Sequence, residues 1–152
     1  MPPERPAPDT PQAWLNRAAS DLAIARTKIE GVYLEDLCYH AQQCVEKAFK
    51  ALLLHRQGRF PYVHDLAELA HRIEAGGLPL PETIRDVVGL TQYAVEGRYP
   101  GVGEPVHEEE WVEAVEGAAR ALACCGSAIS DSEDRAHPNR RSGSAAESPS
   151  DP

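Results

Sequence analysis

A long run with helical periodicity extends from Leu34 to Gly58. Apolar side chains recur in it at steps of three and four residues, and they form a stripe wider than the seam of a coiled coil. A helix with so wide an apolar face needs neighbours on several sides. The sequence therefore predicts a central helix whose buried stripe contains Leu37, Ala41, Cys44, Val45, Ala48, Phe49, Ala51 and Leu52.

A polar ladder runs along the edge of this stripe. His40, Gln43 and Lys47 are again spaced by three and four residues, so they lie on one side of the helix. We expect this ladder to carry any binding function. Two structural alternatives stay open. In the first, Lys47 forms an ion pair with Asp21, and Arg98 could join this pair. His40 and Gln43 could likewise be satisfied by each other or by backbone carbonyls.

Four other segments have helical patterns and plausible boundary residues. Thr10 and Pro11 suit the start of a first helix, which we expect to end at Gly31. Asp21 lies beside the apolar face of this helix, where it could pair with Arg17 or with a cation from another helix. The remaining helices are predicted at 65–75, at 81–95 and from about 104 or 106 to 127. No segment alternates with a period of two, so the sequence predicts an all-α, up-and-down bundle of about five helices.

The composition indicates one domain with two tails. Residues 1–9 and 131–152 are rich in Pro, Ser, Asp and Arg, and we expect them to be disordered, which leaves a helical domain at 10–130. The formal net charge is −9. Such an acidic chain is unsuited to coating nucleic acid through general phosphate attraction, although a small local site for RNA or a nucleotide remains compatible with it.

The four cysteines have no metal-binding spacing. Cys38, Cys44, Cys124 and Cys125 form no CxxC motif, and no histidine stands at a ligand spacing from them. Reduced structural thiols are the first interpretation and a disulfide is the alternative. No signal peptide or membrane span is recognisable, so we expect a cytoplasmic protein that has no metal, no cofactor and no membrane partner.

Taken together, several short motifs resemble the HEPN domain family, named for higher eukaryotes and prokaryotes nucleotide-binding. They occur in the order typical of that family and cover most of the range 10–130. The most specific is the run from Tyr39 to Leu54. The others are Trp14 with 18–22, His64-Asp65-Leu66 with Leu69, and Arg98-Tyr99-Pro100.

This resemblance implies an up-and-down helical bundle that commonly forms homodimers. It also implies one of several roles. Some family members are metal-independent ribonucleases with an Arg-x(4–6)-His motif, often toxins that are held in check by a small nucleotidyltransferase. Other members bind nucleotides or serve as interaction domains.

The chain departs from the ribonuclease pattern in the position of that motif. Arg59 and His64 have the required spacing, but they follow the second helix, whereas the family motif belongs near the last helices. Arg98 lies in the expected region, yet the next histidine, His107, is too distant. His64 could also do no more than shape the start of the third helix.

Three functions follow from these patterns. The first is a partner of a nucleotidyltransferase that binds a nucleotide or RNA in a polar groove, with Tyr99 available for stacking. The second is a ribonuclease toxin, in which a histidine would move the proton of a 2′-hydroxyl and a cation would hold the phosphate. The third is a non-catalytic dimeric module. The expected ligand-binding residues are Asp21, His40, Gln43, Lys47, Arg98 and Tyr99, and the catalytic candidates are Arg59, His64 and Arg98.

Overall fold

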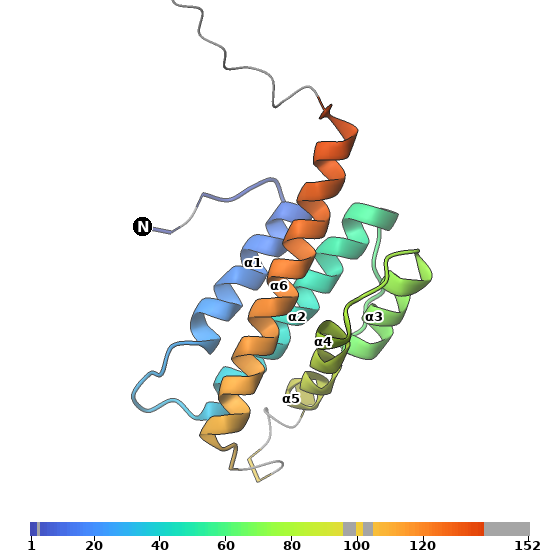
Figure 1. Ribbon diagram of the computed structural model, residues 1–152. Coiled ribbons are helices and arrows are strands. Elements are labelled where there is room, and N and C mark those ends of the chain that lie inside the picture. The colour runs from blue at the N-terminus through green and yellow to red at the C-terminus, as the bar shows by residue number, and fades with distance from the viewer. Residues whose placement is uncertain (3, 96–99, 102–104, 139–152) are drawn as a thin grey trace, which may run out of the picture.

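The computed structural model describes residues 1–2, 4–95, 100–101 and 105–138, and within these ranges the regular secondary structure is helical throughout. Helix α2 (Leu34–Gln57) lies in the middle, flanked by α1 (Pro11–Ala25) and by α6 (Glu108–Ala136) (Figure 1). Three short elements pack along the other side of α2, and these are α3 (Leu66–Ala75), the 3₁₀ helix η1 (Asp86–Thr91) and α5 (Gln92–Val95). The single-turn helix α4 (Glu82–Arg85) precedes η1 and packs on η1 and α6. The prediction of an all-α bundle is confirmed.

The apolar stripe of α2 forms the centre of the core, as its periodicity predicts. Phe49, Leu52 and Val45 have no exposed surface, and Leu37 is 1% exposed. They pack between the buried faces of α1 and α6, which supply mainly small side chains such as Ala18 and Ala118. Helix α6 can therefore approach α2 closely. Burying this stripe is the main driving force for folding.

Helix α1 begins as predicted but ends early. The Thr10 hydroxyl accepts a hydrogen bond from the amide of Ala13 at 3.2 Å, and Pro11 occupies the first turn. The helix ends at Ala25 rather than near Gly31. The Thr27 hydroxyl donates to the carbonyl of Ala23, which is a local bond that competes with helix continuation. Consequently residues 26–33 form a connecting loop, and Gly31 lies within it with a positive φ of 82°.

The segment 81–95 is not the single α-helix that the sequence predicts. It consists of one α-helical turn, a tighter 3₁₀ stretch and another α-helical turn. The 3₁₀ stretch contains the β-branched pair Val87 and Val88 and then Gly89, all of which lower helix propensity. The side chain of Val87 also comes within 3.1 Å of where a Cβ would stand at Gly117 of α6. Close packing on α6 thus accompanies the irregular helix.

Helix α6 extends beyond its predicted end at Ser127, because it continues to Ala136 and includes residues that composition assigns to the C-terminal tail. Ile129 is 5% exposed and makes the last buried contact of the helix. Once a helix is nucleated, adding further residues costs little, so polar residues after Ile129 can remain helical. None of the described helices is long and apolar enough to cross a membrane.

Gly58 ends α2 in the left-handed region, with φ 73°, and its amide donates to the carbonyl of Leu54. The chain then leaves the helix as an irregular segment, residues 59–64, which we call the aromatic arm. Asp65 follows it and caps α3 by accepting from the amide of Ala67 at 2.9 Å. This short connection keeps the arm beside α2.

Candidate functional site

The polar side of α2 divides into two clusters around two carboxylates. The first, the Asp21 cluster, consists of Asp21, His40 and Lys47 and joins α2 to α1. The second, the Glu46 cluster, joins α2 to the aromatic arm and consists of Gln42, Gln43, Glu46, Lys50 and His64. The polar face of α2 below means the six α2 residues of these clusters, which are His40, Gln42, Gln43, Glu46, Lys47 and Lys50.

In the Asp21 cluster, one carboxylate holds two side chains of α2. Asp21 Oδ1 lies 2.9 Å from His40 Nδ1, and Asp21 Oδ2 accepts from Lys47 Nζ at 2.5 Å. The Asp21 side chain is only 9% exposed, while those of Lys47 and His40 are 23% and 32% exposed. The partner of Asp21 is thus a cation on another helix and not Arg17. The carboxylate is buried, but its two partners reach the surface.

In the Glu46 cluster, every acceptor position of the carboxylate is used. Glu46 Oε1 accepts from Lys50 Nζ at 2.8 Å and lies 2.9 Å from His64 Nδ1. Glu46 Oε2 accepts from the side-chain amides of Gln42 and Gln43, each at 3.1 Å. Burial alone would raise the pKa of Glu46, but the hydrogen bonds from Lys50, His64 and Gln42, together with the charge of Lys50, outweigh burial and lower this pKa.

The polar ladder predicted from spacing is therefore split. His40 and Lys47 meet at Asp21, whereas Gln43 turns toward the Glu46 cluster, where it also donates to Gln42 Oε1 at 2.8 Å. Gln42, Glu46 and Lys50 are absent from the predicted site, although all three are at most 5% exposed. Their spacing of four residues could have indicated that they lie on one side of the helix. However, oppositely charged residues at this spacing, such as Glu46 and Lys50, usually form exposed pairs on helix surfaces.

The catalytic candidates of the aromatic arm have different surroundings. His64 is bound to Glu46 through Nδ1, yet 75% of its side chain is exposed. Arg59 is exposed and forms no ion pair with another described residue. The other two predicted site residues, Arg98 and Tyr99, lie outside the described residues. The His107 backbone precedes α6 as its N-terminal cap.

The two histidines share one chemical arrangement. A carboxylate accepts hydrogen bonds, so the proton of each neutral imidazole resides on Nδ1, next to Asp21 in His40 and next to Glu46 in His64. Nε2 then carries the lone pair and can accept a proton or a hydrogen bond from a ligand. Lys47 and Lys50 bind the same two carboxylates. The polar face of α2, together with His64, thus places imidazole nitrogens beside cations.

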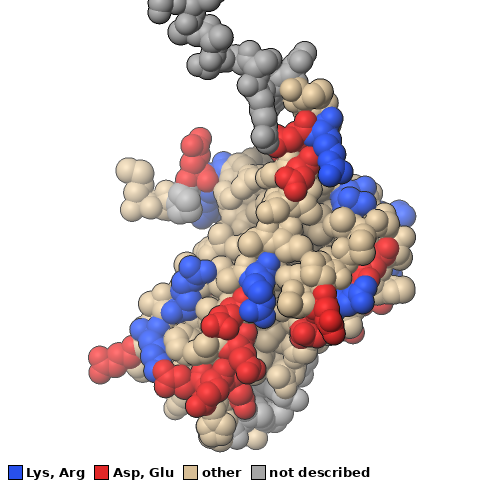
Figure 2. All heavy atoms as spheres, in the orientation of Figure 1, with Lys and Arg blue, Asp and Glu red and all other residues tan. Residues whose placement is uncertain are grey.

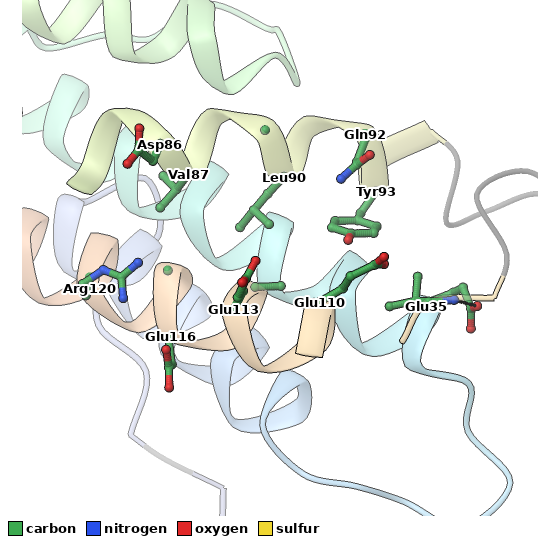
Figure 3. A pocket seen from close by; sticks show the side chains of 14 residues that line it. Glu35, Asp86, Val87, Leu90, Gln92, Tyr93, Glu110, Glu113, Glu116 and Arg120 are labelled. Atoms are coloured by element: carbon green, nitrogen blue, oxygen red, sulfur yellow. Dashed lines mark hydrogen bonds between the residues drawn. The ribbon is translucent and has the colours of Figure 1, made fainter. Parts of the chain in front are cut away.

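A groove with a volume of about 580 Å³ lies elsewhere, between η1, α5 and α6. Asp86, Glu110, Glu113 and Glu116 line it around an apolar floor, and Arg120 is the cation at one end (Figure 3). Acidic side chains also gather outside it near the start of α6 (Figure 2). This charge is unfavourable for a phosphate, and the groove contains none of the predicted site residues.

The cysteines are free thiols without a role in either cluster. Burial raises the pKa of both Cys38 and Cys44 to about 12, and it also raises the pKa of Cys124 and Cys125. Such thiols stay protonated and unreactive near neutral pH. Among the described residues, no group of three or more His, Cys, Asp or Glu side chains could hold a metal ion.

Comparison with known proteins places this geometry in a family. The HEPN domain model matches residues 11–128. Two solved structures are similar at 28% identity. The archaeal HEPN homologue ST0689 has a TM-score of 0.64, with 79% of this chain and 98% of that chain covered. TT1696 from Thermus thermophilus has a TM-score of 0.62, with 77% and 96% covered.

A curated relative matches over a shorter region. A protein of Methanocaldococcus jannaschii named "Putative toxin MJ1304" is 44% identical over 41 residues, which are 27% of this chain and 27% of that protein. The chain thus matches about a quarter of the length of this relative. The family model, in contrast, covers α1, α2, both carboxylate clusters and most of α6. The chain therefore belongs to the HEPN domain family.

Proposed function

We propose that this HEPN domain protein binds a nucleotide or an RNA on the polar face of α2 together with the adjoining His64 of the aromatic arm. The observation that carries the proposal is the pair of histidines, His40 and His64, each held through Nδ1 by a buried carboxylate and each accompanied by a lysine. We further propose that it acts in the cytoplasm as a homodimer with a small nucleotidyltransferase, in a pair of the toxin–antitoxin type. Partial similarity to a protein named as a toxin supports this role.

The existing ion pair at Lys47 does not prevent phosphate binding. A lysine ammonium has three donors, and Asp21 takes one of them. The side chain is 23% exposed, so the remaining donors can reach a phosphate oxygen while the ion pair stays intact. His40 Nε2 can accept from a ribose hydroxyl beside it. Binding therefore needs no rearrangement of α1 against α2.

Lys47→Met tests this proposal, with Lys28→Met as the matched control because Lys28 is 58% exposed and pairs with Glu108 away from this face. Binding of labelled ATP and of a short labelled RNA is measured by fluorescence anisotropy. Loss of one charge-assisted hydrogen bond is expected to weaken binding by roughly 10- to 100-fold in Lys47→Met and to leave Lys28→Met unchanged. Absence of binding by the unaltered protein would contradict the proposal. Unchanged affinity in Lys47→Met with only a lower melting temperature would instead indicate a structural module.

The proposed partner and assembly are tested separately. Co-expression with the product of the neighbouring gene should yield a complex if that gene encodes a nucleotidyltransferase, and light scattering should give twice the monomer mass for the protein alone. A monomer that binds no such partner would remove this part of the proposal and leave ligand binding intact.

Ribonuclease activity is a second candidate, favoured by the exposure of His64. Its ring is oriented by Glu46, so its Nε2 could remove the proton of a ribose 2′-hydroxyl, and exposed Arg59 could hold the phosphate. If so, expression of the protein alone should arrest growth, and His64→Asn or Arg59→Met should relieve the arrest. Normal growth at high expression would argue strongly against a toxic ribonuclease.

A further inference from the structure

The aromatic arm carries a row of rings that has no role in the ligand binding proposed for the polar face of α2. Trp14 of α1 contacts Phe60 edge to face, with ring centroids 4.9 Å apart, and Phe60 lies 6.3 Å from Tyr62. The row begins at the core and ends in solvent, because Phe60 is half-buried while Tyr62 is 97% exposed. A tyrosine so fully exposed gains little from burial, so packing does not account for its position.

The arm is held in place at several points beneath this tyrosine. Lys50 Nζ lies 5.5 Å from the centre of the Phe60 ring, and the Gln42 amide donates to the carbonyl of His64 at 3.3 Å. The amide of Val63 also bonds the carbonyl of Pro61 at 2.9 Å. Phe60 and His64 thus face α2, and Tyr62 between them projects outward. A ring presented in this way loses little conformational freedom on binding a ligand.

Two arginines accompany the row of rings. Arg59 belongs to the arm itself, and Arg17 lies one turn after Trp14 on the same side of α1. Both are exposed, and neither forms an ion pair with another described residue. Aromatic rings beside unpaired cations are the usual elements of a surface that stacks bases and attracts phosphates.

We infer that the aromatic arm is a stacking platform for an unpaired nucleobase, with Tyr62 contacting the base and Arg59 the adjoining phosphate. This inference rests on the proposed function, because it extends the ligand of the α2 polar face toward residues 59–64. His64 connects the two regions, since it is part of both the arm and the Glu46 cluster. A base within a duplex presents no free face to Tyr62, so the ligand is single-stranded RNA or a free nucleotide.

Tyr62→Ala tests the stacking platform, with Tyr62→Phe to retain the ring and Tyr33→Ala as control, because Tyr33 is a 74% exposed tyrosine outside the arm. Each purified full-length protein is titrated against a labelled single-stranded RNA octamer, the same RNA in a duplex, and labelled ATP. Loss of one stacked base is expected to weaken single-strand binding by roughly 5- to 100-fold in Tyr62→Ala. Tyr62→Phe should stay within about twofold of the unaltered protein, since a phenyl ring also stacks, and Tyr33→Ala should bind normally.

The outcomes separate this inference from the function on which it rests. If the unaltered protein binds and Lys47→Met weakens binding while Tyr62→Ala does not, the platform is wrong and the α2 site remains. If the unaltered protein binds none of the three probes, both proposals fail. Equal loss of duplex and single-strand affinity in Tyr62→Ala would also overturn stacking. A loss confined to the octamer identifies an RNA strand, and a parallel loss for ATP identifies the base of a mononucleotide.

Discussion

The Asp21 and Glu46 clusters use the same three chemical groups in opposite settings. Each has a carboxylate, a lysine and a histidine bound through Nδ1. At Asp21 both partners are partly exposed, whereas at Glu46 the lysine side chain is 7% exposed and the histidine 75% exposed. The exposed groups differ accordingly, and we propose ligand contact through the lysine in the Asp21 cluster and through the histidine in the Glu46 cluster. Lys50 is instead committed to stability.

The two lysines should differ most in how much their loss lowers the free energy of unfolding. Lys50→Met leaves the carboxylate of Glu46 buried without its cation, so the free energy of unfolding should fall by about 3–5 kcal/mol. Urea denaturation followed by circular dichroism measures the change. Adding Glu46→Leu should restore part of the loss, because the unpaired charge is then removed. A Lys50→Met protein as stable as the original would show that this ion pair contributes little.

A smaller loss is expected at the Asp21 cluster. Lys47→Met removes a charge-assisted hydrogen bond, but His40 and nearby water can still solvate Asp21, so we expect a loss of about 1–2 kcal/mol. The same denaturation experiment applies. A loss equal to that of Lys50→Met would remove the proposed contrast between a surface lysine and a buried one.

For the histidines the order of the two clusters should be reversed, so that replacing the histidine of the Asp21 cluster lowers the free energy of unfolding more. His64→Asn changes a mostly exposed side chain and should lower the free energy of unfolding by less than about 1 kcal/mol. His40→Asn alters a more buried contact between two helices and should cost more than His64→Asn, although less than Lys47→Met. Thermal unfolding of both variants checks the order. Greater damage from His64→Asn would assign that histidine a structural role.

A still smaller difference is expected in how the free energy of unfolding depends on pH. The pKa of Glu46 is lower in the folded protein than its ordinary value of 4.5, so its ionised form favours folding. This contribution is fully present above the unfolded pKa and is lost as the pH falls through the folded pKa. Stability of the Glu46→Gln variant should therefore decrease less between pH 6 and pH 3 than that of the unaltered protein. Parallel curves from urea titrations at these pH values would contradict this.

Periodicity predicts the helices of this protein better than it predicts their ends. The stripe of α2 is wide enough to require a bundle, and Gly58 marks its end because a left-handed residue follows the last turn. The break at Ala25 and the 3₁₀ stretch near Val87 both coincide with contacts to α6, including the bond from the Trp111 indole to the carbonyl of Ala25 at 2.7 Å. Such contacts between distant segments leave no periodic signal.

The site was only partly predictable for a similar reason. Spacing identifies His40 and Lys47 as neighbours on α2, and the ion pair of Lys47 with Asp21 is one of the alternatives that the sequence leaves open. The burial of Glu46 and Lys50 depends on how the aromatic arm folds back, which no local pattern encodes. The exposure of Tyr62 was unpredictable for the same reason. It follows from the packing of Phe60 beneath it, which keeps the Tyr62 ring at the surface.

Because Gly58 joins α2 directly to the aromatic arm, the length of α2 determines where the proposed binding residues of the arm lie. Only Gly58 separates the last helical residue, Gln57, from the arm, so the last turn determines the direction of the arm. Inserting a single residue into the final turn would rotate everything beyond it by about 100° around the helix axis and advance it by about 1.5 Å. Phe60 and His64 would then be displaced from Lys50 and Glu46, even though no side chain had changed. Deletions and insertions at this junction should therefore be far less tolerated than in the loop between α1 and α2.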